Sequence, residues 1–429
     1  MDQKQAALRL LDFTERGVSP YHVVQESQRI LQENGFTELL LQEKWKLEQG
    51  KKYYVNIYGT TCAAFRINPG FEKGQDIRIA AAHTDWPCLR IKSNPEMNSV
   101  GYQKLNVEVY GGPIDSSWFD RPLSVAGKVS CKGKSVFQPE CHLIDFRRPV
   151  LILPNLAIHM NRDLNKGYAY NAQKDLLPVW GLEDGREQWF LEAVAEEIGV
   201  KKEDIYSFDL YVYVAERGCL AGWKEEMLSS PRIDNLTSCQ SCIQGLIHSH
   251  RQEGIDLIAM FDNEECGSRS KQGADSQMLP MVLEKLTVSL GMTREEYLDT
   301  VLNGFSISLD VAHAIHPNYP EKADLTNRIT LEPAVVIKME PNQRYATDSR
   351  AVAVVEALCE KRNIPCRKFV NRSDIRGGST IGSIASSWLP MPSVDIGAAI
   401  LAMHSARETM GAATQACMDE LVEAYFTEN

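Results

Sequence analysis

The sequence lacks the features of a secreted, membrane-spanning or nucleic-acid-binding protein. The first residues, MDQKQAALRLLDFTERG, have no basic segment followed by an apolar core, and no apolar run approaches the roughly 18 residues that cross a bilayer. The formal net charge is −11, whereas proteins that bind phosphate backbones usually carry a basic surface. Internal repeats and low-complexity tracts are also missing. These absences predict a cytoplasmic protein that binds neither nucleic acid nor membranes.

Cysteine usage does not indicate a disulfide framework. The 11 cysteines are an odd number scattered along 429 residues, which is typical of reduced thiols. CQSC (239–242) is the one closely spaced pair, and without a second pair it favours packing thiols over a zinc or redox site. A chain of this length, with 44% hydrophobic residues, is expected to form two or three domains with a sizeable core.

Four apolar runs predict buried strands, and each run ends beside a side chain that can bind a metal ion. The runs are IRIAAA (77–82), GIDLIAMF (254–261), FSISL (305–309) and SVDIGAAILAM (393–403). Helical patterns alternate with them at 21–34, 187–198, 235–248 and 349–362. This alternation is typical of an α/β fold with a mostly parallel sheet flanked by helices. Because ligands bind beyond the carboxyl ends of such strands, the four ends are expected to share one crevice.

The candidate metal site combines histidines and acids at these strand ends and at the start of one helix. Its members are His83, Asp234, Glu264, Glu265, Asp310 and His404. Mixed imidazole and carboxylate ligands suit zinc, manganese or cobalt rather than calcium or magnesium. Each residue alone has a simpler explanation, such as a turn, a helix N-cap or a solvated helix start. Their shared position favours a metal site, in which one of the two adjacent glutamates binds metal and the other acts as a general base.

The spacing of these residues predicts a catalytic domain that is interrupted by a second domain. Roughly 150 residues, the size of a whole domain, separate His83 from Asp234. We expect a catalytic domain of residues 1–92 plus 234–429 and an inserted β-rich domain of residues 93–233. The expected strands of the insert are LNVEVYGG, VAGKVSCKG, VLILPNLAIH and FDLYVYVAE. One continuous large sheet with a long excursion is the alternative.

A series of longer motifs runs in order from about residue 10 to residue 425. They are AAHTDWPCLRIK, GGPIDSSWFDRPLSVAGKV, LAIHMNRDLNKGY, SPRIDNLTSC, MFDNEECGSRSKQGA, LDVAHAIHPNY, VIKMEPNQRYATD, SDIRGGSTIGSIAS and VDIGAAILAMHSARET. Together they resemble the M18 family of metalloaminopeptidases and, within it, the aspartyl aminopeptidases. Trp86 and the segment DIRGGSTIGS (374–383) depart from the family pattern. Both lie beside the site, so they bear on the shape of the substrate pocket rather than on the metal ligands.

The resemblance implies a centre with two divalent ions per subunit, zinc in the first place and manganese or cobalt as alternatives. It implies that His83 and Asp310 hold one ion, that Glu265 and His404 hold the other, and that Asp234 bridges them. Two ions held about 3.5–4 Å apart lower the pKa of a shared water and polarise a scissile carbonyl. The expected activity is therefore hydrolysis of a peptide bond.

The resemblance also implies roles for residues around the metals. The general base would be Glu264, and Asp85 would orient the site. His159 would reach into the active site of the neighbouring subunit, in a homododecamer built from dimers through the inserted domain. The residues that would recognise an acidic N-terminal side chain are Lys338, His313 and Tyr345.

The predicted function is removal of N-terminal residues, Asp or Glu in particular, from peptides. A broad-specificity aminopeptidase of leucyl type, a related metal-dependent amidohydrolase or deacetylase, and an inactive scaffold are the alternatives. The amidohydrolase would require a cationic clamp for a substrate carboxylate. An intact Glu264 argues against the scaffold, because a general base has no structural duty once Glu265 binds the metal.

Overall fold

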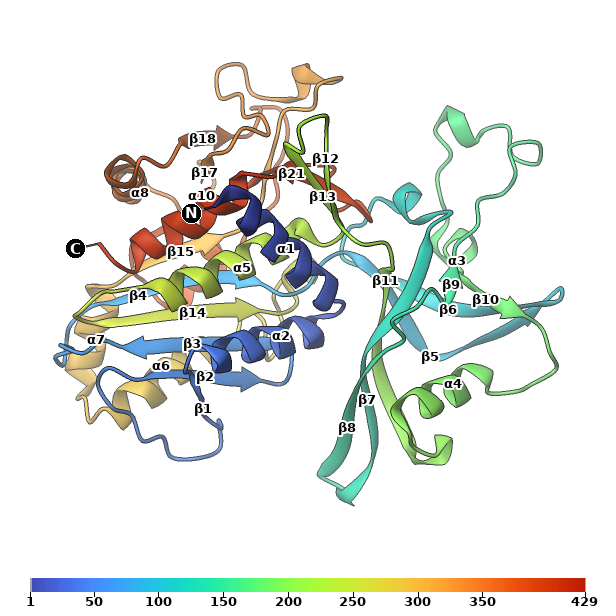
Figure 1. Ribbon diagram of the computed structural model, residues 1–429, viewed down its shortest axis with the longest axis horizontal. Helices are drawn as coiled ribbons and strands as arrows, with labels where there is room; N and C mark the ends of the chain where they lie inside the picture. Colours follow the sequence, from blue (N-terminus) through green and yellow to red (C-terminus); the bar gives the residue numbers. More distant parts are fainter. Residues whose placement is uncertain (1, 429) are drawn as a thin grey trace. The chain divides into compact units, whose positions relative to one another are not determined.

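The four predicted strands are neighbours in one nine-stranded sheet. In the computed structural model, which describes residues 2–428, they are β4 (Ile77–His83), β14 (Ile255–Phe261), β15 (Phe305–Leu309) and β19 (Ser393–Gly397). They lie in the order β14, β4, β15, β19, and every pairing among them is parallel (Figure 1). Their carboxyl ends therefore meet at one edge of the sheet, and the predicted α/β fold class is confirmed.

Further strands extend this sheet on both sides. They are β1 (Thr37–Glu38), β2 (Lys52–Ile57), β3 (Thr61–Ile67), β17 (Val335–Met339) and β18 (Cys366–Val370). Strand β3 pairs antiparallel with β14, and β17 pairs antiparallel with β19. All residues of β14 and β19 are buried. Their apolar runs lack alternation because both faces of the central sheet are covered.

Helices cover both faces of this sheet. Helices α1 (Gln3–Arg16), α2 (Pro20–Glu33), α5 (Ile233–His248) and α10 (Thr414–Tyr425) lie in front of it in Figure 1, and α8 (Ser349–Arg362) packs beside α10. On the opposite face are α6 (Met278–Ser289), α7 (Arg294–Leu302) and α9 (Ile381–Trp388). There, apolar side chains such as Val282, Val301 and Ile381 form one core cluster with Ile79 and Leu257 of the sheet. This burial is the main stabilising contribution to the layered arrangement.

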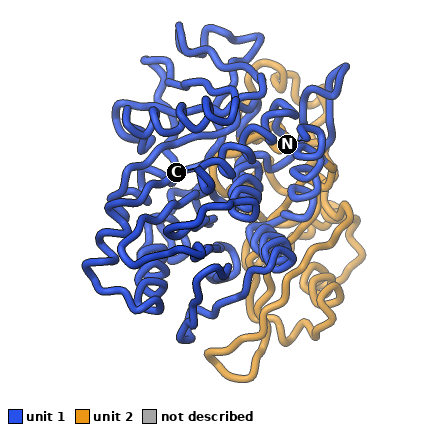
Figure 2. The backbone as a smooth tube through the Cα atoms, turned by 60° about the vertical axis from the view of Figure 1, so that its left-hand side comes forward, with its two compact units in different colours: residues 1–85, 218–403, 408–429 blue, residues 86–217, 404–407 orange. Residues whose placement is uncertain are grey.

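The chain divides into two compact units (Figure 2). Unit 1 comprises residues 1–85, 218–403 and 408–429, and unit 2 comprises residues 86–217 and 404–407. The boundaries thus differ from the predicted 92/93 and 233/234. At the first, β5 (Cys88–Ser99) begins soon after β4 and pairs within unit 2. At the second boundary, residues 219–230 already form strands of unit 1. Their composition is that of strands, and it does not show to which of the two units they belong.

Unit 2 is built on a closed, antiparallel sheet. Its strands are β5, β6 (Tyr102–Tyr110), β7 (Pro122–Ser135), β8 (Gln138–Asp145), β9 (Leu151–Ile152), β10 (Val179–Leu182) and β11 (Ile205–Val214), and its helices are α3 (Ala172–Asp175) and α4 (Trp189–Ile198). Strand β11 pairs with both β5 and β7, which closes the sheet. Of the four expected strands, VLILPNLAIH was overestimated: only two residues pair, because Pro154 lacks the N–H that a ladder needs.

A smaller sheet completes unit 1. Its strands, in spatial order, are β12 (Cys219–Ala221), β13 (Met227–Ser230), β21 (Glu408–Gly411), β20 (Ala399–Leu401) and β16 (Ala312–His313). The run SVDIGAAILAM, predicted as one strand, therefore divides between β19 in the large sheet and β20 in the small one. Of the helices within residues 2–428, none has the length and apolar character of a bilayer-crossing segment.

Candidate active site

His83 is the last residue of β4 and lies among carboxylates. Its Nδ1 is 3.1 Å from the carbonyl oxygen of Asp85, and its Nε2 is 3.4 Å from Asp234 Oδ1 and 3.6 Å from Asp310 Oδ1. The carbonyl can accept a hydrogen bond from a proton on Nδ1, and in the neutral tautomer that this contact favours the Nε2 lone pair would be available to a metal ion. Burial disfavours the imidazolium, but the surrounding carboxylates outweigh burial and raise the pKa of His83 well above its ordinary value.

Asp234 is fixed by its backbone and by its neighbours. Its N–H donates to Glu408 Oε2 at 2.9 Å, and the Asn235 side chain donates to the Leu309 carbonyl at 2.9 Å, beside the end of β15. Arg232 adopts a left-handed φ of 64°, and its guanidinium donates to the Thr14 carbonyl at 2.8 Å. Such a conformation is costly for a residue with a side chain, so these contacts hold it in place. The result is a carboxylate directed at His83.

The two adjacent glutamates follow β14 and are positioned by one aspartate. Asn263 (φ 63°) turns the chain into a short 3-10 helix, η4 (Glu264–Cys266). The backbone N–H groups of Glu264 and Glu265 donate to Asp85 Oδ1 at 3.1 Å and to Asp85 Oδ2 at 3.2 Å, respectively. This bidentate contact fixes the backbone of the turn that carries both acids. Asp85 thus contacts the turn that carries both acids, and the orienting role that the resemblance implies for it stays a prediction.

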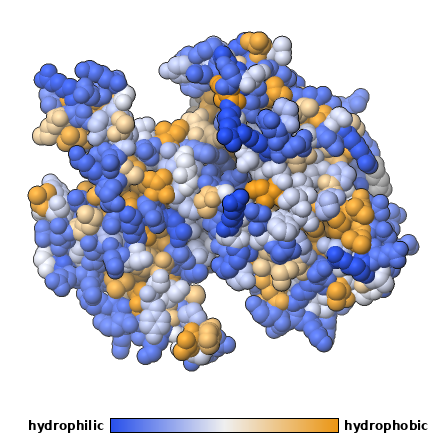
Figure 3. All heavy atoms as spheres, turned by 180° about the vertical axis from the view of Figure 1, so that it is seen from behind, coloured by the Kyte–Doolittle hydropathy of each residue, from blue (hydrophilic) through white to orange (hydrophobic). Residues whose placement is uncertain are grey.

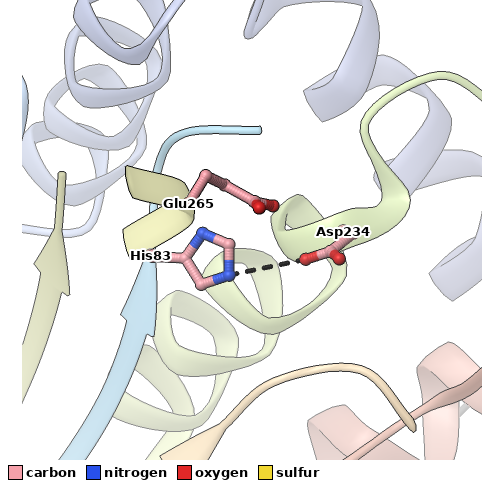
Figure 4. Close-up of side chains that lie close together, drawn as sticks. All are labelled: His83, Asp234 and Glu265. Atoms are coloured by element: carbon pink, nitrogen blue, oxygen red, sulfur yellow. Dashed lines mark ion pairs between the residues drawn. The ribbon is translucent and has the colours of Figure 1, made fainter. Parts of the chain in front are cut away.

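Glu265 converges with His83 and Asp234. One ligand atom from each of the three residues lies within 4.8 Å of the others, which is close enough for one ion to contact all of them (Figure 4). Burial and repulsion from Asp234 raise the pKa of Glu265 well above its ordinary value. Burial likewise raises the pKa of Glu264 to about 8, with neighbouring carboxylates adding to the shift. A divalent cation would offset this crowding of negative charge, so the residues fit a metal ion.

Asp310, just after β15, is shared between His83 and a buried lysine. Lys338 Nζ lies 3.3 Å from Asp310 Oδ2 and 2.9 Å from the Val311 carbonyl, and 4.9 Å from the centre of the Tyr345 ring. Burial alone would raise the pKa of Asp310, but Lys338 and His83 outweigh it and hold that pKa well below the usual range. With 2% of its surface exposed, Lys338 does not extend its ammonium group to solvent, as a lysine at a strand end commonly does.

Three other predicted residues are not brought into this cluster by contacts within unit 1. His404 belongs to unit 2, where its Nδ1 lies 3.0 Å from the Gly112 carbonyl; a proton there leaves the lone pair on Nε2, as in His83. His159 lies in an exposed turn of unit 2. His313 is exposed on β16, with its ring 6.1 Å from that of Phe369. The roles of these three histidines remain predictions.

Two buried acids near the site were not among the predicted residues. Glu408, 2% exposed, holds the Asp234 N–H, and Asp395 of β19 accepts hydrogen bonds from the Thr380 hydroxyl at 2.6 Å and the Ala346 N–H at 2.5 Å. Asp395 lies within a continuous apolar run, SVDIGAAI, and an acid in such a setting is an unusual burial that could have been noticed from sequence. Nothing in the local sequence marks Glu408 in this way.

Comparisons with known proteins show the family of this chain. A family profile described as "Aminopeptidase I zinc metalloprotease (M18)" matches residues 13–426. The chain is 43% identical to "Probable M18 family aminopeptidase 2" of Clostridium acetobutylicum, covering 99% of both chains. It is 36% identical to "Aspartyl aminopeptidase 4" of Saccharomyces cerevisiae, covering 97% of this chain and 93% of the relative.

Solved structures show the same fold. One chain of a structure titled "Cryo-EM structure of the Ape4 and Nbr1 complex" superposes with a TM-score of 0.95 at 32% identity, over 99% of this chain and 86% of that one. The mApe1 dodecamer of Saccharomyces cerevisiae gives a TM-score of 0.87 at 23% identity, over 99% and 97%. From its strand-end cluster and these matches, the chain belongs to the M18 family of zinc metalloproteases and is a metalloaminopeptidase.

Proposed function

We propose that this aminopeptidase is dinuclear and that it removes an acidic residue, Asp or Glu, from the N-terminus of peptides. The observation that carries the dinuclear part is the number of metal-capable groups in one place. Unit 1 alone brings the imidazole of His83 together with the carboxylates of Asp234, Glu265 and Asp310. One tetrahedral metal ion with an open position needs only three protein ligands, so a cluster of four metal-capable side chains has ligands to spare for a second ion.

In the proposed centre, His83 and Asp310 would hold one ion, Glu265 and His404 would hold the other, and Asp234 would serve as a ligand of both. Zinc is the ion that the family description favours, and manganese or cobalt would accept the same ligands. When bound, the ions polarise the scissile carbonyl and lower the pKa of water. The tautomer of His83, set by the Asp85 carbonyl, supports its role as a ligand through Nε2.

Glu264 is the proposed general base. It follows Asn263 in the same turn as Glu265, and the bidentate contact of Asp85 with both backbone N–H groups fixes the backbone from which the two side chains extend. Glu264 would take a proton from the attacking water and pass it to the leaving amine. Asp85 would act through this turn and through His83, as an orienting residue.

Lys338 is the proposed basis of acid preference, with Tyr345 and His313 completing the pocket. Its burial means that an acidic substrate side chain would find an ammonium that is poorly screened by water. Its contact with Asp310 adds a second effect, because a change at Lys338 would also alter a proposed metal ligand. The relative named as an aspartyl aminopeptidase supports the acidic preference.

We also propose assembly into a homododecamer that is built from dimers. Unit 2 would be the dimerisation domain, and His159 would reach the active site of a neighbouring subunit. Large apolar side chains that are almost fully exposed in the single chain support burial against other copies. They include Phe137 (95%), Val136 (93%) and Trp223 (96%). Groups of apolar side chains also interrupt the hydrophilic surface on the face drawn in Figure 3. The solved mApe1 assembly named as a dodecamer supports the same arrangement. A cytoplasmic location suits the free cysteines.

A panel of dipeptides tests the proposed activity. Substrates that differ only in the first residue (Asp, Glu, Leu or Lys) are supplied with free and with acetylated N-termini to protein reconstituted with zinc, manganese or cobalt. We expect kcat/KM to be highest for free N-terminal Asp or Glu. Equal or better cleavage of leucyl substrates would refute the acidic preference and leave a broad-specificity aminopeptidase. Cleavage of acetylated substrates would contradict the requirement for a free N-terminus.

A further inference from the structure

A buried carboxylate stands beside the proposed specificity lysine in the large sheet. Asp395 is the middle residue of β19, and none of its surface is exposed. It is the register partner of Lys338 in β17 on one side and of Ser308 in β15 on the other. Residues that lie opposite each other in a sheet project from the same face, so the side chains of Asp395 and Lys338 share one face. A carboxylate buried there requires hydrogen-bond donors.

Two segments of unit 1 supply these donors. The Ala346 N–H donates to Asp395 Oδ2 at 2.5 Å, and the Thr380 hydroxyl donates to Asp395 Oδ1 at 2.6 Å. Ala346 follows Tyr345, a residue of the proposed substrate pocket. Thr380 belongs to DIRGGSTIGS, the segment that departs from the family pattern. One carboxylate therefore joins both segments to the sheet.

The two segments also contact each other. The Thr380 N–H donates to the Arg344 carbonyl at 3.3 Å, and the Arg344 guanidinium donates to the Gly377 carbonyl at 2.5 Å. Between them and the proposed specificity residue lies Tyr345, which is 5% exposed and whose ring centre is 4.9 Å from Lys338 Nζ. Residues 344–347 and 377–380 thus form one layer, and Asp395 connects this layer to the strand beside Lys338.

The start of α9 is fitted closely around this carboxylate. A Cβ at Gly382, in the first turn of the helix, would lie 2.7 Å from Asp395 Oδ2 and 2.7 Å from the Cβ of Ser308. Only a residue without a side chain permits this approach. Thr380 is the N-cap residue of α9, yet within residues 2–428 its hydroxyl caps no N–H group of the helix and donates to Asp395 instead. The contact with Asp395 thus takes the place of an ordinary stabilising cap.

We propose that Asp395 is a positioning residue for substrate recognition, which holds the segment that carries Tyr345 and the glycine-rich segment before α9 in place beside Lys338. This inference rests on the proposed acidic specificity and adds a residue to its machinery. Asp395 acts through Ala346 and Thr380 and not by contact with the substrate. An acidic side chain would need directed contacts in this pocket, whereas a leucyl side chain needs only apolar surface. Loss of the anchor should therefore weaken binding of aspartyl substrates more than binding of leucyl substrates.

Hydrogen exchange of the zinc-loaded, full-length protein tests the positioning without any substrate. Asp395→Asn keeps the size of the side chain but replaces one of the two acceptor oxygens with an NH₂ group. We expect amides of residues 344–347 and 377–380 to exchange at least about ten-fold faster, since a hydrogen bond to a charged group is lost. Ser393→Ala is the matched control on the same strand, because its hydroxyl donates only to the Met391 carbonyl at 2.9 Å. Unchanged exchange in Asp395→Asn, or faster exchange throughout unit 1, would overturn the proposal.

Steady-state kinetics test the link to substrate recognition. Thr380→Val removes the donated hydroxyl at nearly constant volume and provides a second variant that leaves the carboxylate in place. In both variants we expect KM for an aspartyl dipeptide to rise about ten-fold, while KM for the leucyl dipeptide and the zinc content stay within about two-fold of the parent. Equal losses on both substrates would show a merely structural role and would overturn the proposal.

The parent protein separates this proposal from the proposed function. A parent without preference for aspartyl over leucyl dipeptides would refute the acidic specificity. The exchange rates of residues 344–347 and 377–380 would then still show whether Asp395 positions the two segments, because they are measured without substrate.

Discussion

Exchange of Glu264 for glutamine separates the proposed proton transfer by this residue from metal binding by its neighbours. Glutamine keeps the size of the side chain, and the Asp85 contacts involve only the backbone N–H groups of Glu264 and Glu265, so the turn should persist. Loss of a general base costs about 10²- to 10⁴-fold in rate, which corresponds to about 3–5 kcal/mol of barrier. We expect kcat to fall by this amount while zinc content, measured by elemental analysis, stays within error of the parent.

Glu265→Gln is the matched comparison, because it changes the neighbouring acid in the same turn. This variant should lose metal affinity, since Glu265 is the one of the pair that converges with His83 and Asp234. Adding excess zinc should restore part of its activity, whereas zinc should not rescue Glu264→Gln. Metal loss in Glu264→Gln with retention in Glu265→Gln would mean that the two roles are reversed and would refute the assignment.

Glu264→Gln should also change the pH dependence of stability, measured on protein from which a chelator has removed the metal. Burial raises the pKa of Glu264 to about 8, above the value of about 4.3 in an unfolded chain. The folded state then binds the proton more tightly than the unfolded state, so stability falls as pH rises between these two values. In Glu264→Gln this part of the fall should disappear, and Tm measured from pH 5 to pH 8 should decline less than in the parent. A parallel decline in both proteins would contradict the raised pKa.

Three further predictions concern specificity, assembly and the backbone behind the site. Lys338→Met should reduce the preference for aspartyl over leucyl substrates by at least about ten-fold. It should also weaken metal retention, because Asp310 loses its ion-pair partner. An unchanged substrate preference would show that Lys338 does not recognise the substrate side chain. His159→Phe should lower kcat without changing metal content, and an active parent monomer in analytical ultracentrifugation would rule out its cross-subunit role. A Cβ at position 397 would overlap the Asp310 carbonyl oxygen, so Gly397→Ala should lower the free energy of unfolding by about 1–3 kcal/mol and reduce zinc affinity. Gly378→Ala is the control, because nothing lies within 4 Å of a Cβ at that position, and it should change neither quantity. Equal unfolding midpoints of the two variants in urea would contradict this prediction.

The convergence of His83, Asp234, Glu265 and Asp310 in unit 1 could be anticipated because strand burial and strand direction have strong local signals. The strands that precede His83, Glu264 and Asp310 are rich in buried apolar residues, and parallel neighbours end at the same edge of the sheet. Asp234 was placed correctly at a helix start, but its non-helical backbone and its Glu408 partner depend on strand β21, which lies 174 residues away. Contacts at such separation leave no local pattern.

Register and pairing between distant strands account for what the sequence did not show. Lys338 pairs with Asp310 because β17 lies beside β19, and β19 in turn lies beside β15, the strand that leads to Asp310. Whether this lysine is exposed or buried cannot be deduced from the five apolar residues before it. The limits of unit 2 depend in the same way on β12 and β13 joining a sheet with β21, although their sequences resemble those of the insert.

The central claim is that the cluster holds two metal ions, and anomalous diffraction from crystals of zinc-loaded protein at the zinc absorption edge tests it most directly. We predict two peaks per chain, about 3.5–4 Å apart, with His83 and Asp310 at one, Glu265 and His404 at the other, and Asp234 between them. Data collected on either side of the edge would confirm that both peaks are zinc. A single peak per chain in crystals of active enzyme, or a second peak remote from Glu265, would contradict the proposed dinuclear centre.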